Sequence, residues 1–223
     1  RARETILPER FSFHSARMRM KKVTKEELAA MDAQSLRCAV ELADAEVDVI
    51  GYACLVAIMS AGRGYHRVSE TQLGQAVQEA GAPCPIVTSA GALVQVLGEL
   101  GTRNVAIITP YLRPLTNLVV DYIQHEGFNV LDSIALEIPD NLDDLKRLDV
   151  TGADTVVLSA CVQMPSLDAL SRAEDILGLP VLSAAACTTR MMRKSVDLDP
   201  VAPGAGTALS ASFQRLSSEA LPL

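Results

Sequence analysis

Short apolar segments alternate with helical patterns along most of the chain, and this alternation constrains the fold more than any other feature. The segments expected as strands cover residues 11–20, 47–53, 85–88, 104–109, 128–136, 155–160 and 180–183. The patterns expected as helices cover residues 25–45, 69–80, 90–100, 113–126, 142–148, 165–177 and 188–194. Two capping boxes, at 24–27 and 69–72, mark the starts of the first two helices. Such alternation is typical of an α/β fold with parallel sheet, in which ligands bind outside the carboxyl ends of the strands.

An internal repeat divides the chain into two similar parts. Residues 47–55 and 153–162 both consist of an Asp, an apolar strand and then Ala-Cys followed by an aliphatic residue. Farther along, residues 85–90 and 180–185 are both a Pro-led strand that ends in small or hydroxyl residues. The same order in both halves predicts two similar lobes with parallel sheets flanked by helices, each lobe offering one cysteine at the carboxyl end of a strand.

The two repeated cysteines, Cys54 and Cys161, point to chemistry on a small anion. A thiol between a buried strand and a helix faces the ligand crevice, where backbone N–H groups favour a thiolate or a carboxylate. Two facing thiols suit proton transfer on opposite faces of a planar substrate, or attack by one thiolate with the other thiol as acid. A loop with Arg63, His66 and Arg67 follows Cys54. These cations could steer a dianion, although a solvated loop is the simpler interpretation.

Composition excludes several other classes of function. The net charge is −7, aromatic residues make up 4% of the chain and Trp is absent, which argues against nucleic-acid binding or a polybasic membrane contact. The five cysteines have no C-x-x-C spacing and the three histidines are scattered, so neither a disulfide framework nor a metal site is expected. We expect a cytoplasmic protein without a metal or another cofactor. The remaining cysteines, which we expect to pack as small hydrophobes, are Cys38, Cys84 and Cys187.

At the two cysteine motifs the chain resembles the Asp/Glu racemase superfamily and, more narrowly, its maleate cis-trans isomerase family. The similarity covers nearly the whole chain and is carried by residues 51–56 (GYACLV), 109–111 (TPY), 139–142 (PDNL) and 159–166 (SACVQMPS). It implies a pseudo-twofold fold with the active site between two intertwined lobes. These would be residues 1–90 with 190–223, and residues 91–189. It further implies a homodimeric, cofactor-independent enzyme that converts maleate to fumarate, often in nicotinate breakdown.

The resemblance also implies residue roles. Cys54 would be the nucleophile and Cys161 the acid. The residues that would bind the substrate carboxylates, largely through the backbone, are Leu55, Val56, Val162 and Gln163. Tyr111 and Asn141 would add side-chain hydrogen bonds. Without the resemblance, Tyr111 could be a surface tyrosine and Asn141 a turn or helix-cap residue.

Two departures from the family pattern bear on activity. The family has an earlier strand with a Ser-Asn-Thr segment whose Asn binds substrate, so we expect a strand that would precede residue 1. The stretch 141–155 is also shorter than the resemblance implies, and we expect a further loop there that covers the site.

Three other functions remain open on sequence grounds. An amino-acid racemase of the aspartate/glutamate type would use the same two cysteines as acid and base. A decarboxylase of substituted malonates is disfavoured, since such enzymes of the superfamily keep only one of the two thiols. A binding module for dicarboxylates would perform no chemistry at all.

Overall fold

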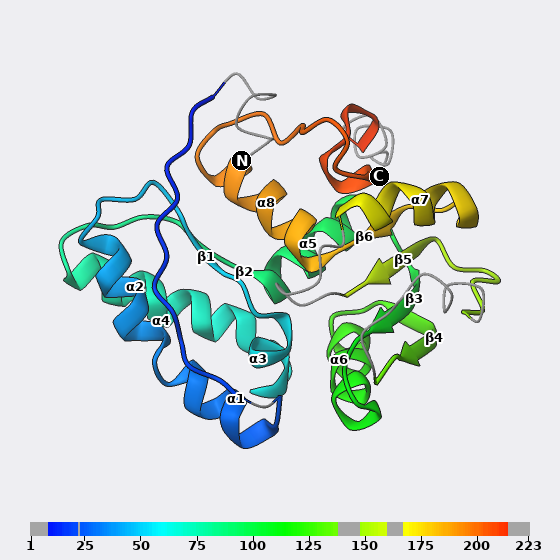
Figure 1. Cartoon of the computed structure of the whole chain (residues 1–223), viewed down its shortest axis with the longest axis horizontal. Coiled ribbons are helices and arrows are strands. Elements are labelled where there is room, and N and C mark those ends of the chain that lie inside the picture. Colours follow the sequence, from blue (N-terminus) through cyan, green and yellow to red (C-terminus); the bar gives the residue numbers. More distant parts are fainter. Residues whose placement is uncertain (1–8, 22, 138–147, 160–166, 214–223) are drawn as a thin grey trace.

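The fold is an α/β arrangement built on two separate parallel sheets (Figure 1). The computed structural model describes residues 9–21, 23–137, 148–159 and 167–213. The strands are β1 (Ile50–Tyr52), β2 (Ile86–Thr88), β3 (Asn104–Thr109), β4 (Asn129–Ala135), β5 (Thr155–Leu158) and β6 (Val181–Leu182). The helices are α1 (Lys25–Asp32), α2 (Ser35–Ala43), α3 (Leu55–Ser60), α4 (Tyr65–Glu79), α5 (Ser89–Glu99), α6 (Arg113–His125), α7 (Leu167–Leu177) and α8 (Ala184–Ser195), with a short 3-10 helix η2 (Thr207–Leu209).

The two sheets lie side by side. One contains β1 and β2, and the other has the order β4-β3-β5-β6, with every pairing parallel. Helix α5 lies between them in Figure 1, where it packs against α8 and β2. The core is continuous across both sheets, and the centre of β3, residues 105–108, is fully buried. The expected fold class, parallel sheets flanked by helices, is therefore confirmed.

The sequence repeat corresponds to a repeat in backbone geometry. The N–H of Ile50 donates to the carbonyl of Pro85 at 3.0 Å, and the N–H of Val156 donates to the carbonyl of Pro180 at 2.9 Å. At the far end of each pair, a hydroxyl caps the next helix. Thr88 accepts from the N–H three residues on, at the start of α5, and Ser183 does the same at the start of α8. The β1-β2 and β5-β6 units are thus built alike.

The prediction of a strand over residues 11–20 is wrong. This stretch contains no strand and runs along the surface past α2 and α4, as the dark blue trace in Figure 1 shows. Its apolar residues do not share one buried face, because Phe13 is 80% exposed. Phe11 instead packs beside Phe13 and the guanidinium of Arg193. The contacts of this segment are with side chains and not with a strand edge.

The single helix expected over residues 25–45 is two helices. Thr24 caps α1 by accepting from the N–H of Glu27 at 3.3 Å, as the capping box predicts. A tight turn at Ala33 and Gln34 then separates α1 from α2. The turn changes the direction of the chain, so the two helices contact different neighbours, α3 and α4 respectively.

Other helix starts differ from the predicted ones. Helix α4 begins at Tyr65, behind Gly64 in the left-handed region (φ 70°), so the expected cap Ser69 lies buried inside the helix. Helix α8 begins four residues early because Ser183 caps it. Helix α3, which follows Cys54 directly, was not predicted, since its residues continue the apolar run of β1. The helix expected over 142–148 falls on residues outside the described ones, except Leu148.

A partly buried charge cluster ties α5 to α8. The guanidinium of Arg190 bonds the Glu99 carboxylate at 3.2 Å and stacks 3.8 Å from the ring centre of Phe213. Lys194 also pairs with Glu99. Burial alone would raise the pKa of Glu99, but its bonds to Lys194 and Arg190 outweigh burial and hold that pKa below the ordinary 4.5. The Glu99 carboxylate therefore stabilises the fold in its ionised form.

We expect Glu99→Gln to lower the free energy of unfolding at pH 7 by roughly 2 kcal/mol, since charged hydrogen bonds are lost. A carboxyl with a depressed folded pKa contributes fully above its ordinary pKa and loses that contribution as the pH falls through the folded value. The difference between wild type and variant should therefore shrink as acid is added. Urea titrations at pH 7 and at about pH 4 measure it, and a difference that grows in acid would contradict the assignment.

Candidate active site

Cys54 lies two residues beyond the end of β1, at the N-cap position of α3. Its backbone is extended (φ −145°, ψ 97°), and its side chain is half-buried. The first two residues of α3, Leu55 and Val56, are buried. The first N–H groups of a helix have no partner within the helix. The structure thus places a thiol beside backbone N–H groups that can donate hydrogen bonds to an anion.

Cys54 differs from the other strand-end caps in one respect. Thr88 and Ser183 bond the amides of their own helices, whereas Cys54 makes no side-chain cap bond to α3. A sulfur is a weak acceptor, so it competes poorly for backbone N–H groups. The start of α3 therefore lacks the side-chain cap bond that the starts of α5 and α8 have.

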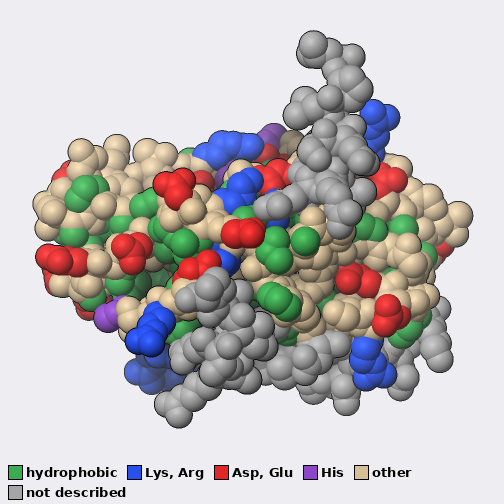
Figure 2. All heavy atoms as spheres, turned by 90° about the horizontal axis from the view of Figure 1, so that it is seen from above, with side chains coloured by type: hydrophobic (Ala, Val, Ile, Leu, Met, Phe, Trp, Pro, Cys, Tyr) green, Lys and Arg blue, Asp and Glu red, His purple; other side chains and the backbone are tan. Residues whose placement is uncertain are grey.

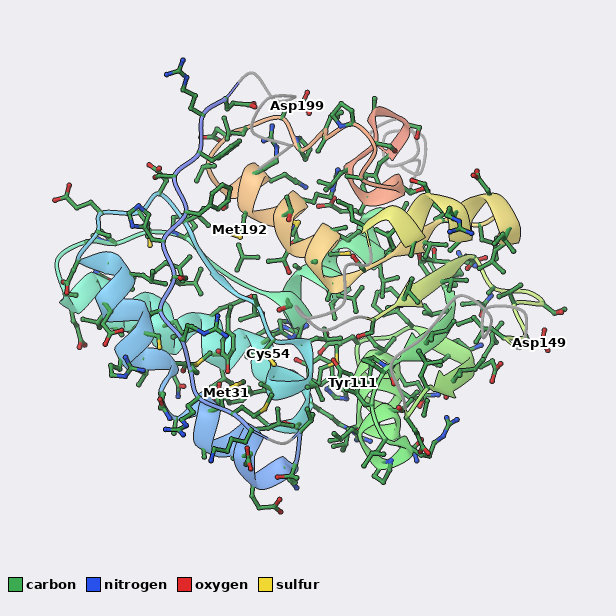
Figure 3. All side chains as sticks on the ribbon, in the orientation of Figure 1. Met31, Cys54, Tyr111, Asp149, Met192 and Asp199 are labelled. Carbon is green, nitrogen blue, oxygen red and sulfur yellow. The ribbon has the colours of Figure 1, made fainter. Side chains whose placement is uncertain are left out.

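Tyr111 lies in the short turn that joins β3 to α6, at the carboxyl end of β3. Its side chain is only 6% exposed, so the interpretation as a surface tyrosine is wrong. The hydroxyls of Thr109 and Thr116, 2.6 Å apart, close this turn, and Thr116 also reaches the carbonyl of Leu112. Figure 3 shows Cys54 and Tyr111 near the middle of the molecule, where the β1-β2 half meets the half with β3 to β6.

The second cysteine and three of the expected substrate-binding residues lie outside the described residues. These are Cys161, Val162, Gln163 and Asn141. The strand that leads toward Cys161 is described as far as Ser159, whose N–H donates to the carbonyl of Ile108 at 2.8 Å. Strand β5 therefore ends beside the end of β3, from which Tyr111 comes.

Ser159 is a residue that sequence reasoning missed. It is 3% exposed, and its hydroxyl has no hydrogen-bond partner in the structure. Buried hydroxyls are almost always paired. Its only sequence signal was its place in the repeat, where it matches Tyr52. A buried hydroxyl two residues before Cys161 is available to a ligand.

The cations that follow Cys54 do not form a free basic loop. Arg63 bonds Asp121 with both Nε and Nη2, and Arg67 makes two bonds to Glu126, both carboxylates being at α6 or just beyond its end. His66 is buried, with Nδ1 2.5 Å from the Tyr122 hydroxyl. These side chains tie α4 and the loop before it to α6. Their contacts therefore indicate a structural role, and not the steering of a dianion.

The other described cysteines behave as packing residues. Cys38 and Cys187 are buried, and Cys84 is partly buried against the core. Burial raises the pKa of the Cys187 thiol strongly, and burial together with Asp48 raises that of Cys84. Thiolate formation is therefore disfavoured at both positions.

The surface offers few other candidates. A hollow of about 550 Å³ between α4, α5 and α8 is lined by His66, Glu70 and Lys194, and neither Cys54 nor Tyr111 reaches it. On the face seen in Figure 2, acidic and basic side chains are interspersed. Within the described ranges, no helix is long and apolar enough to cross a membrane, and no group of His, Cys, Asp and Glu could hold a metal ion.

Comparison with known proteins identifies the family. Residues 3–209 match the family model described as arylmalonate decarboxylase. The maleate isomerase of Pseudomonas putida is 56% identical, over 95% of this chain and 89% of that protein. The chain belongs to the maleate isomerase family.

Two solved structures of this family share the fold. The maleate isomerase Iso of Pseudomonas putida S16, as a Cys-to-Ala variant with maleate, has a TM-score of 0.88 at 53% identity over 95% of this chain and 89% of that chain. The Nocardia farcinica maleate cis-trans isomerase, as a Cys-to-Ser variant with a covalently bound succinylcysteine intermediate, has a TM-score of 0.88 at 43% identity over 93% and 90%. The expected family is confirmed.

Iodoacetamide at neutral pH should label Cys54 before the other described cysteines. Cys54 is partly accessible, whereas Cys187 is fully buried and burial disfavours its thiolate. Brief alkylation of the native protein, digestion and peptide mass spectrometry measure the order. Alkylation of the urea-unfolded protein is the control, because all cysteines should then react alike. Earlier labelling of Cys187 in the native protein would contradict the described geometry.

Proposed function

We propose that the chain catalyses cis–trans isomerisation of maleate to fumarate, with Cys54 as the nucleophile and Cys161 as the proton carrier. The observation that carries this proposal is the half-buried Cys54 at the N-cap position of α3, in a chain 56% identical to a maleate isomerase. A nucleophile that attacks one carbon and a facing group that carries a proton to and from the other suffice for this reaction. The reaction therefore needs no cofactor.

The proposed reaction has three steps. The Cys54 thiolate attacks one alkene carbon of maleate, so a C–S bond forms and the electron pair of the double bond moves toward the adjacent carboxylate. The thiol of Cys161 then protonates the neighbouring carbon, and rotation about the new single bond becomes cheap. The Cys161 thiolate finally removes a proton from that carbon, the C–S bond breaks and fumarate leaves. Both thiols return to their starting states.

The succinylcysteine of the Nocardia relative supports the division of roles. That variant has lost one cysteine, so a remaining cysteine must have attacked the alkene. A succinyl group also carries a proton on the second carbon, which means that both addition and protonation took place in that variant. In the present chain the strand-end repeat supplies two cysteines for the two roles, Cys54 and Cys161.

We assign the substrate carboxylates to the groups around these thiols. The amides of Leu55 and Val56 in the first turn of α3 would bind the carboxylate nearest Cys54 and stabilise the charge that develops on it. The buried Tyr111 side chain would bond a carboxylate from the β3 side. Family resemblance alone supports the assignments of Asn141, Val162 and Gln163.

The setting of the enzyme is also a proposal. We place the site between two lobes, residues 1–90 with 190–223 and residues 91–189, because one sheet lies in 50–88 and the other in 104–182. The family resemblance supports a homodimer that acts in nicotinate breakdown. The cytoplasm fits a chain whose described cysteines form no disulfide.

Mass spectrometry of two variants tests the roles of the thiols. Cys161→Ala incubated with maleate should gain the mass of one maleic acid on the peptide that contains Cys54, because the nucleophile is intact. Its turnover should be poor, because release needs a proton transfer that Ala cannot make. Cys54→Ala should gain no such mass.

The same experiment separates the alternatives. A racemase with paired acid and base would give no adduct in either variant and would exchange the alpha proton of aspartate or glutamate. An adduct on Cys161 in Cys54→Ala would show that the two thiols are interchangeable. Loss of maleate absorbance by the wild type, with fumarate identified by NMR, is the reference measurement.

Tyr111→Phe should raise the KM for maleate about tenfold, because one hydrogen bond to a charged group is worth roughly 1.5 kcal/mol. Tyr122→Phe is the matched control, since it removes the hydroxyl that bonds His66 on α4 and touches no candidate site residue. Steady-state kinetics of the two variants measure the difference. A larger rise in KM for Tyr122→Phe would contradict the placement of Tyr111 at the substrate.

A further inference from the structure

Two tyrosines donate to one carboxylate beside the Cys54 segment. The Tyr52 hydroxyl bonds Oδ1 of Asp32 at 2.8 Å, and the Tyr65 hydroxyl bonds Oδ2 at 2.7 Å. Tyr52 is the last residue of β1, Tyr65 is the first of α4, and Asp32 is the last of α1. One side chain therefore joins three elements that are separate in the fold.

The two tyrosines flank the segment that the proposed chemistry needs. Residues 53–64 lie between them and contain Cys54 and all of α3. Both ends of this segment are thus held by the same carboxylate. Tyr52 is also fixed from the other side, because its carbonyl accepts from the Ser89 hydroxyl at 2.6 Å.

Tyr52 is close to the thiol as well as to Asp32. In an extended chain, residues two apart point to the same face, so Tyr52 and Cys54 share a side. The charge of Cys54 contributes to the raised pKa of Tyr52, which supports this proximity. Burial is the largest cause of that rise, followed by Asp32, and burial and Asp32 raise the pKa of Tyr65 to about 12. Both phenols therefore remain hydrogen-bond donors at neutral pH.

Helix stability does not account for the position of Asp32. An acidic residue in the last turn of a helix faces the negative end of the helix dipole, which is unfavourable. The two tyrosine bonds offset that cost. Through these bonds the end of β1 and the start of α4 share Asp32 as a hydrogen-bond partner. This arrangement points to a need to fix the position of these two ends relative to each other.

We propose that Asp32 is a positioning residue that holds the Cys54–α3 segment at both ends through Tyr52 and Tyr65. This inference rests on the proposed function, since it concerns how the thiol and the α3 amides meet the substrate. A nucleophile must lie within a few tenths of an ångström of its productive position, and a shift of about 1 Å can cost 100-fold in rate.

Kinetics of Asp32→Asn, Asp32→Ala and Tyr65→Phe test the proposal. The Asn amide keeps one acceptor oxygen but places an NH2 group beside the other phenol, so only one of the two phenols can still donate to residue 32. Ala leaves neither phenol an acceptor there. We expect kcat for maleate to fall about 10- to 100-fold. The rate of Cys54 labelling by iodoacetamide should change little, because a small reagent can approach the thiol from many directions.

Two further variants separate positioning from general destabilisation. Thr155→Val breaks the buried Thr102–Thr155 hydroxyl pair (2.9 Å) at the opposite end of β5, and should lose stability while keeping kcat. If Tyr65 acts only through Asp32, then adding Tyr65→Phe to Asp32→Ala should lower kcat no further. Thermal unfolding of each variant provides the comparison.

The outcomes are distinct. If the wild type turns over maleate and the Asp32 variants have the same kcat, this inference is overturned and the proposed function stays intact. A parallel fall in kcat and in iodoacetamide labelling, or an equal fall in Thr155→Val, would also overturn it. Absence of maleate turnover by the wild type would overturn the proposed function and this inference with it.

Discussion

Parallel pairing at a shared register is the constraint on which the candidate site depends. Parallel strands bring their carboxyl ends to one edge, and the ladder bonds of Ile50 to Pro85 and of Val156 to Pro180 set that edge at the same level in both halves. Cys54 and Tyr111 both follow such ends, after β1 and β3. A shift of one residue in the β1-β2 ladder would turn the residues that lead to Cys54 to the other face, and a shift in the β3-β5 ladder would do the same for those that lead to Tyr111.

The residue at each helix start decides whether that start serves the fold or a ligand. Thr88 and Ser183 satisfy the amides of α5 and α8, and these helices form the packed centre between the sheets. A Ser or Thr in place of Cys54 could cap α3 in the same way and would compete with a bound carboxylate. Helix α3 forms without a side-chain cap bond from Cys54 because the packing of its buried residues 55–59 stabilises it.

Much of this arrangement was predictable from sequence, because strand periodicity and the repeat are local signals. The range 104–109 for β3 was correct at both ends, and the repeat located β1, β2, β5 and β6. Contacts between distant residues were not predictable. Asp32 meets Tyr52 and Tyr65 across 20 and 33 residues, and no periodicity marks a carboxylate that will lie between two phenols. The ion pairs of Arg63 and Arg67 were not predictable for the same reason, since their partners lie on α6 or just beyond its end.

The contacts between α4 and α6 join the half with β1 and β2 to the half with β3 to β6. The Tyr122 hydroxyl accepts from the backbone N–H of His66 at 3.1 Å and lies 2.5 Å from Nδ1 of the ring. Burial and the neighbouring Arg67 lower the pKa of His66, so the ring is neutral at pH 7. The exposed Arg63–Asp121 pair adds little stability, whereas the buried His66–Tyr122 contact cannot exchange its partners for water. Asp32 therefore joins α1, β1 and α4 within one half, while a buried neutral contact joins α4 to α6.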